Sequence, residues 1–223
     1  TSFKQAAQDA INAPDAYRSS DHDPVLIGLE LDPPFPGASV LDNFNRPGSA
    51  LGPNWRGSTS AYKIVGNQQV DVRNNGPIYW RNAFGVNQEV FVTLTDVDED
   101  ALEQNLLLKV QGSVLPNWGA GVIEVLYDAN SNTVTVWTFR PDTLAWYGYS
   151  PIPVTFADGD QFGARALSNG LVLIYKNGVE VGAITLNTGD QAFFNPKGGR
   201  IGLWFINAKD AYFDDFGGGN IVP

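Results

Sequence analysis

The sequence predicts an all-β protein folded as an antiparallel β-sandwich of the jelly-roll type. From Val40 to Phe216, short apolar runs alternate with polar residues, the period of a strand with one buried face. Clusters of Asn, Asp and Gly interrupt these runs about every ten residues, as turns do in a sandwich. The composition agrees, because 24 Gly, 14 Pro and 12% aromatic residues suit a turn-rich sheet protein.

The strongest single element is a hairpin over residues 171–186, LVLIYKNGVEVGAITL. Leu171, Leu173 and Tyr175 alternate with Val172, Ile174 and Lys176 up to Asn177-Gly178, the period of a strand with one buried face. This dipeptide favours a type I′ turn, in which both central residues need a positive φ. Just upstream, Asp158-Gly159-Asp160 predicts a turn into another strand, residues 161–167.

The other strands follow the same rhythm. The first is expected at Val40–Arg46 and the last at Ala211–Phe216, so the two ends of the domain would pair. Between them the alternation predicts strands at residues 61–65, 68–73, 78–80, 89–95, 105–111, 121–127, 133–139, 144–149 and 200–206. Residues 38–223 are therefore expected to form one sandwich.

Charge and composition exclude several function classes. The formal charge is −10, from 14 basic and 24 acidic side chains, and such a surface repels phosphate backbones. No nucleic-acid binding is therefore expected. Cysteine is absent and His22 is the single histidine, which removes thiol nucleophiles, His-rich zinc sites and Ser-His-Asp triads from residues 37–223. No apolar run reaches membrane-spanning length.

The N-terminal segment carries a different signal. Residues 17–25, YRSSDHDPV, resemble the closing motif of the endonuclease/exonuclease/phosphatase superfamily, the DNase I-like fold. The preceding residues 12–17, NAPDAY, resemble its bacterial extracellular nuclease branch. The resemblance implies that His22 was the general base and that Asp21 contacted Mg²⁺ or Ca²⁺ in a parent nuclease, as phosphodiester hydrolysis requires. The alternative is a chance match in a surface loop.

The motif divides the chain into three parts. Residues 1–31 are interpreted as the C-terminal remnant of a nuclease domain, without the rest of its catalytic machinery and so inactive. Residues 32–37, DPPFPG, hold three prolines and predict a stiff, extended linker. Residues 38–223 form the sandwich. The resemblance implies a secreted, extracellular bacterial protein.

The sandwich resembles the concanavalin A-like fold, in its laminin-G branch. The residues that carry this resemblance are Leu41–Arg46, Leu51-Gly52 with Trp55, Gly159-Asp160 with Ala164–Ala166, Tyr175–Gly178, Ile201–Leu203 and Phe213–Phe216. They cover most of residues 40–217. Because this fold hosts lectins, lyases, hydrolases and adhesion modules, the resemblance implies a fold more than an activity.

A calcium site is predicted where the two ends of the sandwich meet. Ca²⁺ prefers several hard oxygen ligands, and the resemblance implies a structural calcium here. The predicted ligands are Asp42, Asn43, Asn45, Asp214 and Asp215. The alternative is that these carboxylates lie on the surface or cap turns. A second acidic run, residues 96–100, lacks the Glu-x-Asp-x-x-Glu pattern of sandwich glycosidases and is interpreted as a solvated loop, with a second calcium loop as the alternative.

Aromatic residues predict a ligand-binding face. Sugar rings stack on exposed aromatic side chains, although core packing is the commoner role of an aromatic residue. The predicted ligand-binding residues are Trp137, Trp146, Tyr147 and Tyr149, with Phe139, Trp80 and Trp118 as further members of the platform. Trp146 and Tyr147 are adjacent, so they should point to opposite faces of their strand.

These observations favour a non-catalytic accessory domain of a secreted bacterial nuclease. Its expected ligand is a carbohydrate or another extracellular polymer. Two alternatives stay open. One is a glycan hydrolase or lyase on the same fold, which would need a carboxylate pair or an arrangement of Tyr, Arg and Lys that the sequence does not reveal. The other is a purely structural or secretion module.

Overall fold

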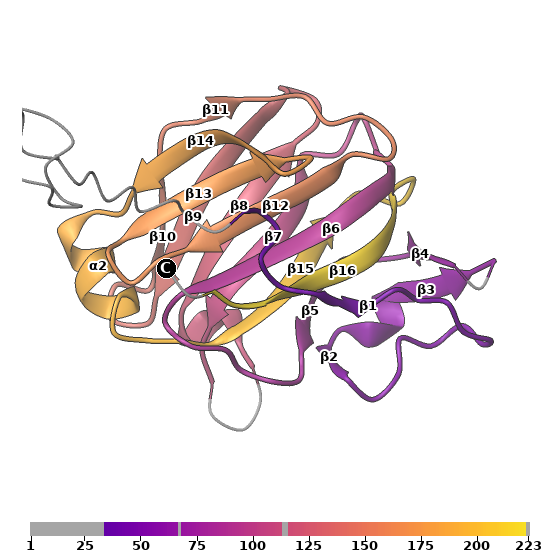
Figure 1. Ribbon diagram of the computed structural model, residues 1–223, viewed down its shortest axis with the longest axis horizontal. Coiled ribbons are helices and arrows are strands. Elements are labelled where there is room, and N and C mark those ends of the chain that lie inside the picture. The colour runs from indigo at the N-terminus through magenta and orange to yellow at the C-terminus, as the bar shows by residue number, and fades with distance from the viewer. Residues whose placement is uncertain (1–33, 67, 113–115, 222–223) are drawn as a thin grey trace, which may run out of the picture. The chain divides into compact units, whose positions relative to one another are not determined.

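The computed structural model describes residues 34–66, 68–112 and 116–221. Residues 33–223 form one compact unit. Within it, two antiparallel eight-stranded sheets lie face to face (Figure 1). The predicted all-β sandwich is confirmed. None of the helices among the described residues has the length and apolar character needed to cross a membrane.

The first sheet, sheet A, contains the two ends of the sandwich and the predicted hairpin. Its strand order is β14 (Val179–Thr185), β13 (Leu171–Lys176), β12 (Gln161–Ala166), β6 (Gln88–Asp96), β16 (Tyr212–Asn220), β4 (Gln69–Val72) and β3 (Tyr62–Val65), and β1 (Val40–Asp42) also pairs with β16. In the hairpin turn, φ is 51° at Asn177 and 81° at Gly178. Both values are positive, as the Asn-Gly signal predicts.

The second sheet, sheet B, carries five of the six tryptophans. Its order is β10 (Ala145–Gly148), β9 (Thr133–Arg140), β8 (Val122–Asp128), β7 (Glu103–Val110), β15 (Arg200–Ile206), β5 (Gly76–Trp80) and β2 (Trp55–Gly57), and β11 (Ile152–Pro153) pairs with β9. The neighbours β7 and β15 are far apart in the sequence. This long-range pairing decides which side chains meet on the outer face of the sheet.

The core lies between the sheets and follows the period of two. On β8, Ile123 and Val125 face the core, whereas Glu124 points to the outer face of sheet B. At the other end of the core, Trp55 and Trp80 meet edge to face with their ring centroids 5.5 Å apart. Trp80, predicted as part of the aromatic platform, is therefore a core residue.

The two ends of the sandwich pair as predicted. Val40 lies opposite Gly217, and Asp42 lies opposite Phe216 in the antiparallel ladder between β1 and β16. The last strand continues to Asn220, beyond its predicted end at Phe216.

One cluster of Asn, Gly and Asp between two strands is the start of a helix. Residues 187–190 combine Asn, Gly and Asp, which is turn chemistry, but α2 (Thr188–Phe194) begins here. Asn187 is its N-cap, and its side chain accepts a hydrogen bond from the backbone N–H of Asp190 at 3.0 Å. Because N-caps and turns favour the same residues, local composition does not separate them.

Part of the predicted linker packs against sheet A. The ring of Phe35 stacks on Tyr175 with their centroids 4.1 Å apart, and Gly163 leaves room for it. The carbonyl of Pro34 accepts a hydrogen bond from Arg165 Nη2 at 2.8 Å, and Arg165 forms a buried ion pair with Glu89 at 2.8 Å. The chain is therefore anchored to the sandwich from residue 34 onward.

The predicted nuclease remnant lies outside the described residues. Asp21 and His22 both belong to residues 1–33. The nuclease assignment, its metal contact and the docking of this segment stay predictions from the sequence.

Candidate functional site

An aromatic groove lies on the outer face of sheet B. It has a volume of about 340 Å³ and is formed where β8, β9, β10, β7 and β15 expose their outward side chains. We call this depression the aromatic groove, and its lining residues are Trp137, Trp146, Trp204, Leu126, Ile206, Glu103 and Glu124.

Strand register explains how the groove forms. Trp137 on β9 lies between Glu124 on β8 and Gly148 on β10. A Cβ atom at Gly148 would lie 2.7 Å from the Trp137 indole, so only glycine lets the ring lie flat beside the edge strand. Trp204 joins from β15, two strands beyond β8.

A supporting layer of aromatic rings holds one wall of the groove. Trp118, in the 3₁₀ turn η2 (Trp118–Ala120), stacks on Trp146 with ring centroids 5.6 Å apart. Its ring also lies 5.7 Å from Trp204 and 5.1 Å from Phe139. These contacts fix the indole planes before any ligand arrives, which lowers the entropy lost on binding.

Two carboxyl groups form the polar floor of the groove. Asn105 on β7 donates one hydrogen bond from Nδ2 to Glu124 Oε1 at 2.7 Å and another to Glu103 Oε2 at 3.2 Å. Because both bonds start at one nitrogen, the two accepting oxygens are no farther apart than the sum of those lengths, about 5.9 Å. The buried Oδ1 of Asn105 has no hydrogen-bond partner within the described part of the chain.

Burial makes one of these carboxyl groups a neutral acid. Desolvation raises the pKa of Glu124 to about 8, and the nearby charge of Glu103 adds to the shift, while the Asn105 hydrogen bond opposes it. Burial also raises the pKa of Glu103. At neutral pH Glu124 therefore carries its proton and can donate a hydrogen bond, as buried acids do in some enzyme sites.

Neither glutamate of the floor is neutralised by a cation. Across residues 34–66, 68–112 and 116–221, the ion pairs involve other carboxylates, and neither Glu103 nor Glu124 takes part in one. The groove thus combines flat apolar rings with one hydrogen-bond donor and one acceptor. This arrangement can hold a molecule with apolar faces and hydroxyl edges.

Comparison with solved structures identifies the fold. A carbohydrate-binding module, CBM66 from Bacillus subtilis, has 12% sequence identity and a TM-score of 0.51, with 78% of this chain and 97% of that chain covered. A Bacillus subtilis protein of unknown function with a galectin-like fold has 13% identity and a TM-score of 0.54, with 82% and 96% covered. The Crh5 transglycosylase in complex with NAG has 11% identity and a TM-score of 0.56, with 82% and 84% covered. The fold is concanavalin A-like and galectin-like.

The comparisons by sequence find no relative. No family model matches the chain, and no curated protein does. At 8–13% identity, the structural similarity establishes the concanavalin A-like fold and no activity.

The structure separates the four predicted ligand-binding residues into two sites. Trp137 and Trp146 both line the aromatic groove. Tyr147 points to the other side of β10, where its ring meets Tyr149 edge to face at 5.0 Å. Trp146 and Tyr147 thus lie on opposite sides of their strand.

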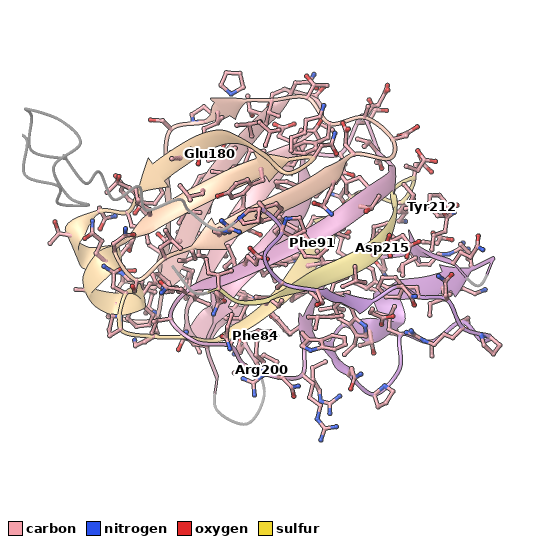
Figure 2. All side chains as sticks on the ribbon, viewed as in Figure 1. Phe84, Phe91, Glu180, Arg200, Tyr212 and Asp215 are labelled. Atoms are coloured by element: carbon pink, nitrogen blue, oxygen red, sulfur yellow. The ribbon has the colours of Figure 1, made fainter. Side chains whose placement is uncertain are left out.

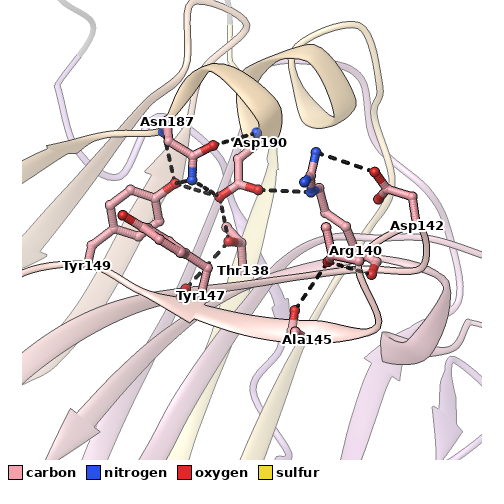
Figure 3. A network of polar contacts seen from close by, with 9 residues as sticks. Thr138, Arg140, Asp142, Ala145, Tyr147, Tyr149, Asn187 and Asp190 are labelled. Atoms are coloured by element: carbon pink, nitrogen blue, oxygen red, sulfur yellow. Dashed lines mark hydrogen bonds and ion pairs between the residues drawn. The ribbon is translucent and has the colours of Figure 1, made fainter.

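Tyr149 belongs to a buried polar network centred on Asp190 (Figure 3). Asp190 Oδ2 accepts hydrogen bonds from the Tyr149 hydroxyl at 2.5 Å and from Thr138 Oγ1 at 2.6 Å, and Oδ1 pairs with Arg140 Nε at 3.2 Å. This network ties α2 to β9 and to Tyr149, which follows the end of β10. A cavity of about 150 Å³ lies beside it, less than half the volume of the aromatic groove.

Sequence reasoning missed Trp204, Glu103, Asn105 and Glu124. One local signal was present, since Glu124 is the only charged residue in the apolar run of residues 121–127, GVIEVLY. An acidic side chain within such an apolar strand indicates a specific role for that side chain on the outer face of the sheet. Its partners on β7 and β15 could be found only from the order of the strands.

Asp42, a predicted calcium ligand, has another role in the structure. Its Oδ1 accepts hydrogen bonds from the Phe44 backbone N–H at 2.9 Å and from Arg46 Nη1 at 2.6 Å. Its Oδ2 accepts from Arg46 Nη2 at 3.0 Å and from Trp55 Nε1 at 2.8 Å. These four bonds fill the acceptor positions of the carboxylate, and the Arg46 guanidinium balances its negative charge.

The other predicted calcium ligands do not complete a site with it. Asn43 Oδ1 accepts the backbone N–H of Asn45 at 3.2 Å, and Asp214 Oδ1 accepts that of Asp215 at 2.7 Å. Asp215 lies on β16 (Figure 2). No group of three or more His, Cys, Asp or Glu side chains suited to a metal ion occurs among the residues that the structure describes. Asp42 therefore does not fit as a ligand of the calcium that the resemblance implies, and the calcium site itself stays a prediction.

The acidic run at residues 96–100 begins at the last residue of β6 and continues into the loop that follows. Asp96, Glu99 and Asp100 are exposed, as expected for a solvated loop. Asp98 differs, because it is buried and its carboxylate accepts backbone N–H groups from Asp100 at 3.2 Å and from Asp210 at 3.3 Å. It caps the loop.

Proposed function

We propose that this domain is a non-catalytic carbohydrate-binding module that holds a polysaccharide chain in the aromatic groove. The observation that carries the proposal is the placement of three half-buried tryptophans, Trp137, Trp146 and Trp204, around a hydrogen-bonding floor. The C–H faces of a sugar ring stack on indoles, and its hydroxyl groups match carboxyl donors and acceptors.

The structural comparisons support this proposal. The similar structures include a protein named as a carbohydrate-binding module and a transglycosylase in complex with NAG. Both share the concanavalin A-like sandwich. The aromatic groove gives this chain a place where such a ligand would lie.

One observation favours a second function, glycan hydrolysis. The hydrogen-bonded oxygens of Glu103 and Glu124 are at most about 5.9 Å apart, and retaining glycosidases keep their carboxyl pair about 5–5.5 Å apart. However, both glutamates share the Asn105 amide in one floor, so they would approach the sugar from the same side. Glycosidase carboxyl groups flank the scissile bond, and we therefore favour binding. Release of reducing ends from a polysaccharide would reverse this preference.

The biological setting rests on the sequence alone. We propose that the module was attached to a secreted bacterial nuclease and held it near an extracellular polymer, because residues 17–25 resemble a nuclease motif. The purely structural or secretion role is the alternative that remains if no polymer binds.

Affinity gel electrophoresis tests the proposal. Wild type, Trp137→Ala and Tyr147→Ala would be run through gels containing β-glucan, galactan, mannan or pectin. Tyr147 is the matched control, since it is an exposed aromatic residue on the other side of β10. We expect at least one polymer to retard wild type and Tyr147→Ala but not Trp137→Ala. If no polymer retards the wild type, or if both variants behave alike, the proposal is wrong.

A further inference from the structure

We infer that the aromatic groove selects uncharged polysaccharides over anionic ones, because its floor holds the carboxyl groups of Glu103 and Glu124 and its lining contains no cationic side chain. This inference rests on the proposed function and names its ligand class. It concerns the floor of the groove, whereas the proposed function rests mainly on the indole walls.

The hydrogen-bonding capacity of the floor is fixed by Asn105. Its amide has two N–H donors, and both are used, one by Glu124 and one by Glu103. The amide therefore has no hydrogen left for a ligand. The donor that the floor can offer is the Glu124 acid proton, and the acceptor is the half-buried Glu103 carboxylate.

The charge of the groove disfavours an anionic chain. Its lining contains two carboxyl groups and no Lys, Arg or His. A uronate or sulfate group would lie over the Glu103 carboxylate in a partly desolvated site, without a cation to pair with it. The formal charge of −10 on the chain adds a long-range repulsion of the same sign. An uncharged chain has neither cost.

The groups around Glu124 explain why it stays protonated. Glu103 and the Asn105 amide face it from β7, and the Tyr79 phenol lies near it from β5. Trp137 is its neighbour on β9. Glu103 is the nearest charge among them, and it is negative. Burial and the negative charge of Glu103 oppose ionisation of Glu124, whereas the Asn105 hydrogen bond favours it.

Isothermal titration calorimetry on matched polymers tests the charge preference. One pair is galactan and carrageenan, a sulfated galactan, and another is methyl-esterified pectin and polygalacturonate. We expect the uncharged member of at least one pair to bind at least about tenfold more tightly than its anionic partner. Equal or tighter binding of both anionic polymers would overturn the inference.

A pH series tests the role of Glu124 with the isosteric variant Glu124→Gln. If only the protonated form binds, and its pKa is about 8, wild-type affinity should fall about tenfold between pH 7 and pH 9. The glutamine amide keeps a donor at every pH, so this variant should bind almost equally at both. A wild-type affinity that does not change with pH, or a variant with the same decline, would overturn the inference.

These outcomes are distinguishable from failure of the proposed function. If no glycan binds at any pH, both the proposed function and this inference are wrong. Binding that depends on Trp137 but shows no charge preference and no pH dependence leaves the proposed function intact and removes the inference alone. A thermal melt of wild type and of each variant at pH 7 and pH 9 shows that the protein is folded under the conditions of the binding measurements.

Discussion

The side-chain amide of Asn105 donates a hydrogen bond to Glu124 Oε1 at 2.7 Å, beneath a groove lined by three tryptophans. Both residues are buried on the outer face of a sheet, where side chains are normally solvated. A buried acid in this position has consequences for stability as well as for binding, and it gives the first prediction.

Glu124→Gln should stabilise the protein at pH 8 but not at pH 4. Burial raises the pKa of Glu124 from 4.5 to about 8. Between these values the folded protein keeps a proton that the unfolded chain loses, so the free energy of unfolding falls as pH rises, by up to about 1.4 kcal/mol per pH unit. The variant lacks this slope. Urea melts from pH 4 to pH 9 measure it, and parallel curves for both proteins would contradict the prediction.

Gly148→Ala should weaken glycan binding without unfolding the sandwich. Its Cβ would meet the Trp137 indole at 2.7 Å, so the ring must move out of its place in the groove wall. Strand β10 pairs only with β9 within sheet B, and the cost in stability should be about 1 kcal/mol. Calorimetry with the retarding polymer should show at least about a threefold loss of affinity. Ala145→Ser, on the same strand, is the control, and an unchanged affinity for Gly148→Ala would argue against the wall geometry.

Asp42→Ala should destabilise the end of the sandwich. The substitution leaves the Arg46 guanidinium and the Trp55 indole N–H without their shared acceptor. Because Arg46 is partly exposed, its share is screened, and the total cost should be about 2–3 kcal/mol. Asn43→Ala, at an exposed neighbour, should cost less than about 0.5 kcal/mol. Equal midpoints for the two variants in urea would show that the ion pair contributes little.

Phe35→Ala should loosen the attachment of residues 34–37 to sheet A. It removes the stacking on Tyr175 and leaves a hole above Gly163. The expected cost is about 1–3 kcal/mol, since Phe35 is only half-buried. Hydrogen exchange should speed up at Ala38, whose backbone N–H bonds to Glu89. Exchange at Ala38 as slow as in wild type would show that Phe35 does not anchor the segment.

Local sequence signals were sufficient for most of the fold. The Asn177-Gly178 turn depends on neighbouring residues, and both of its φ angles are positive as predicted. On β13, Val172 and Ile174 face the core, but Leu173 and Tyr175 on the other face are buried as well, so the strand does not have one exposed face. The helix α2 was missed because Asn187 favours an N-cap and a turn for the same physical reason. Short edge strands such as β2 also lacked a signal, since three residues show no period.

The site was only half predictable. Trp137 and Trp146 lie on consecutive strands joined by a short connection, so their proximity could be predicted from the sequence, while their role in binding stays a prediction. Trp204 reaches the groove because β15 pairs with β7, about a hundred residues upstream, and that pairing is not written in any local pattern. Asp42 was predicted as a metal ligand because its hydrogen-bond partner on another segment could not be identified from the sequence. Its Trp55 partner becomes visible only in three dimensions.

The most direct test of the aromatic groove is the two-dimensional ¹H–¹⁵N spectrum of the indole N–H groups during titration with a retarding polysaccharide. The chain has six tryptophans, and Trp55 and Trp80 lie in the core between the sheets. We expect the indole signals of Trp137, Trp146 and Trp204 to shift with a common dissociation constant, while those of Trp55 and Trp80 stay in place. A titration that shifts none of the three groove signals would contradict the account.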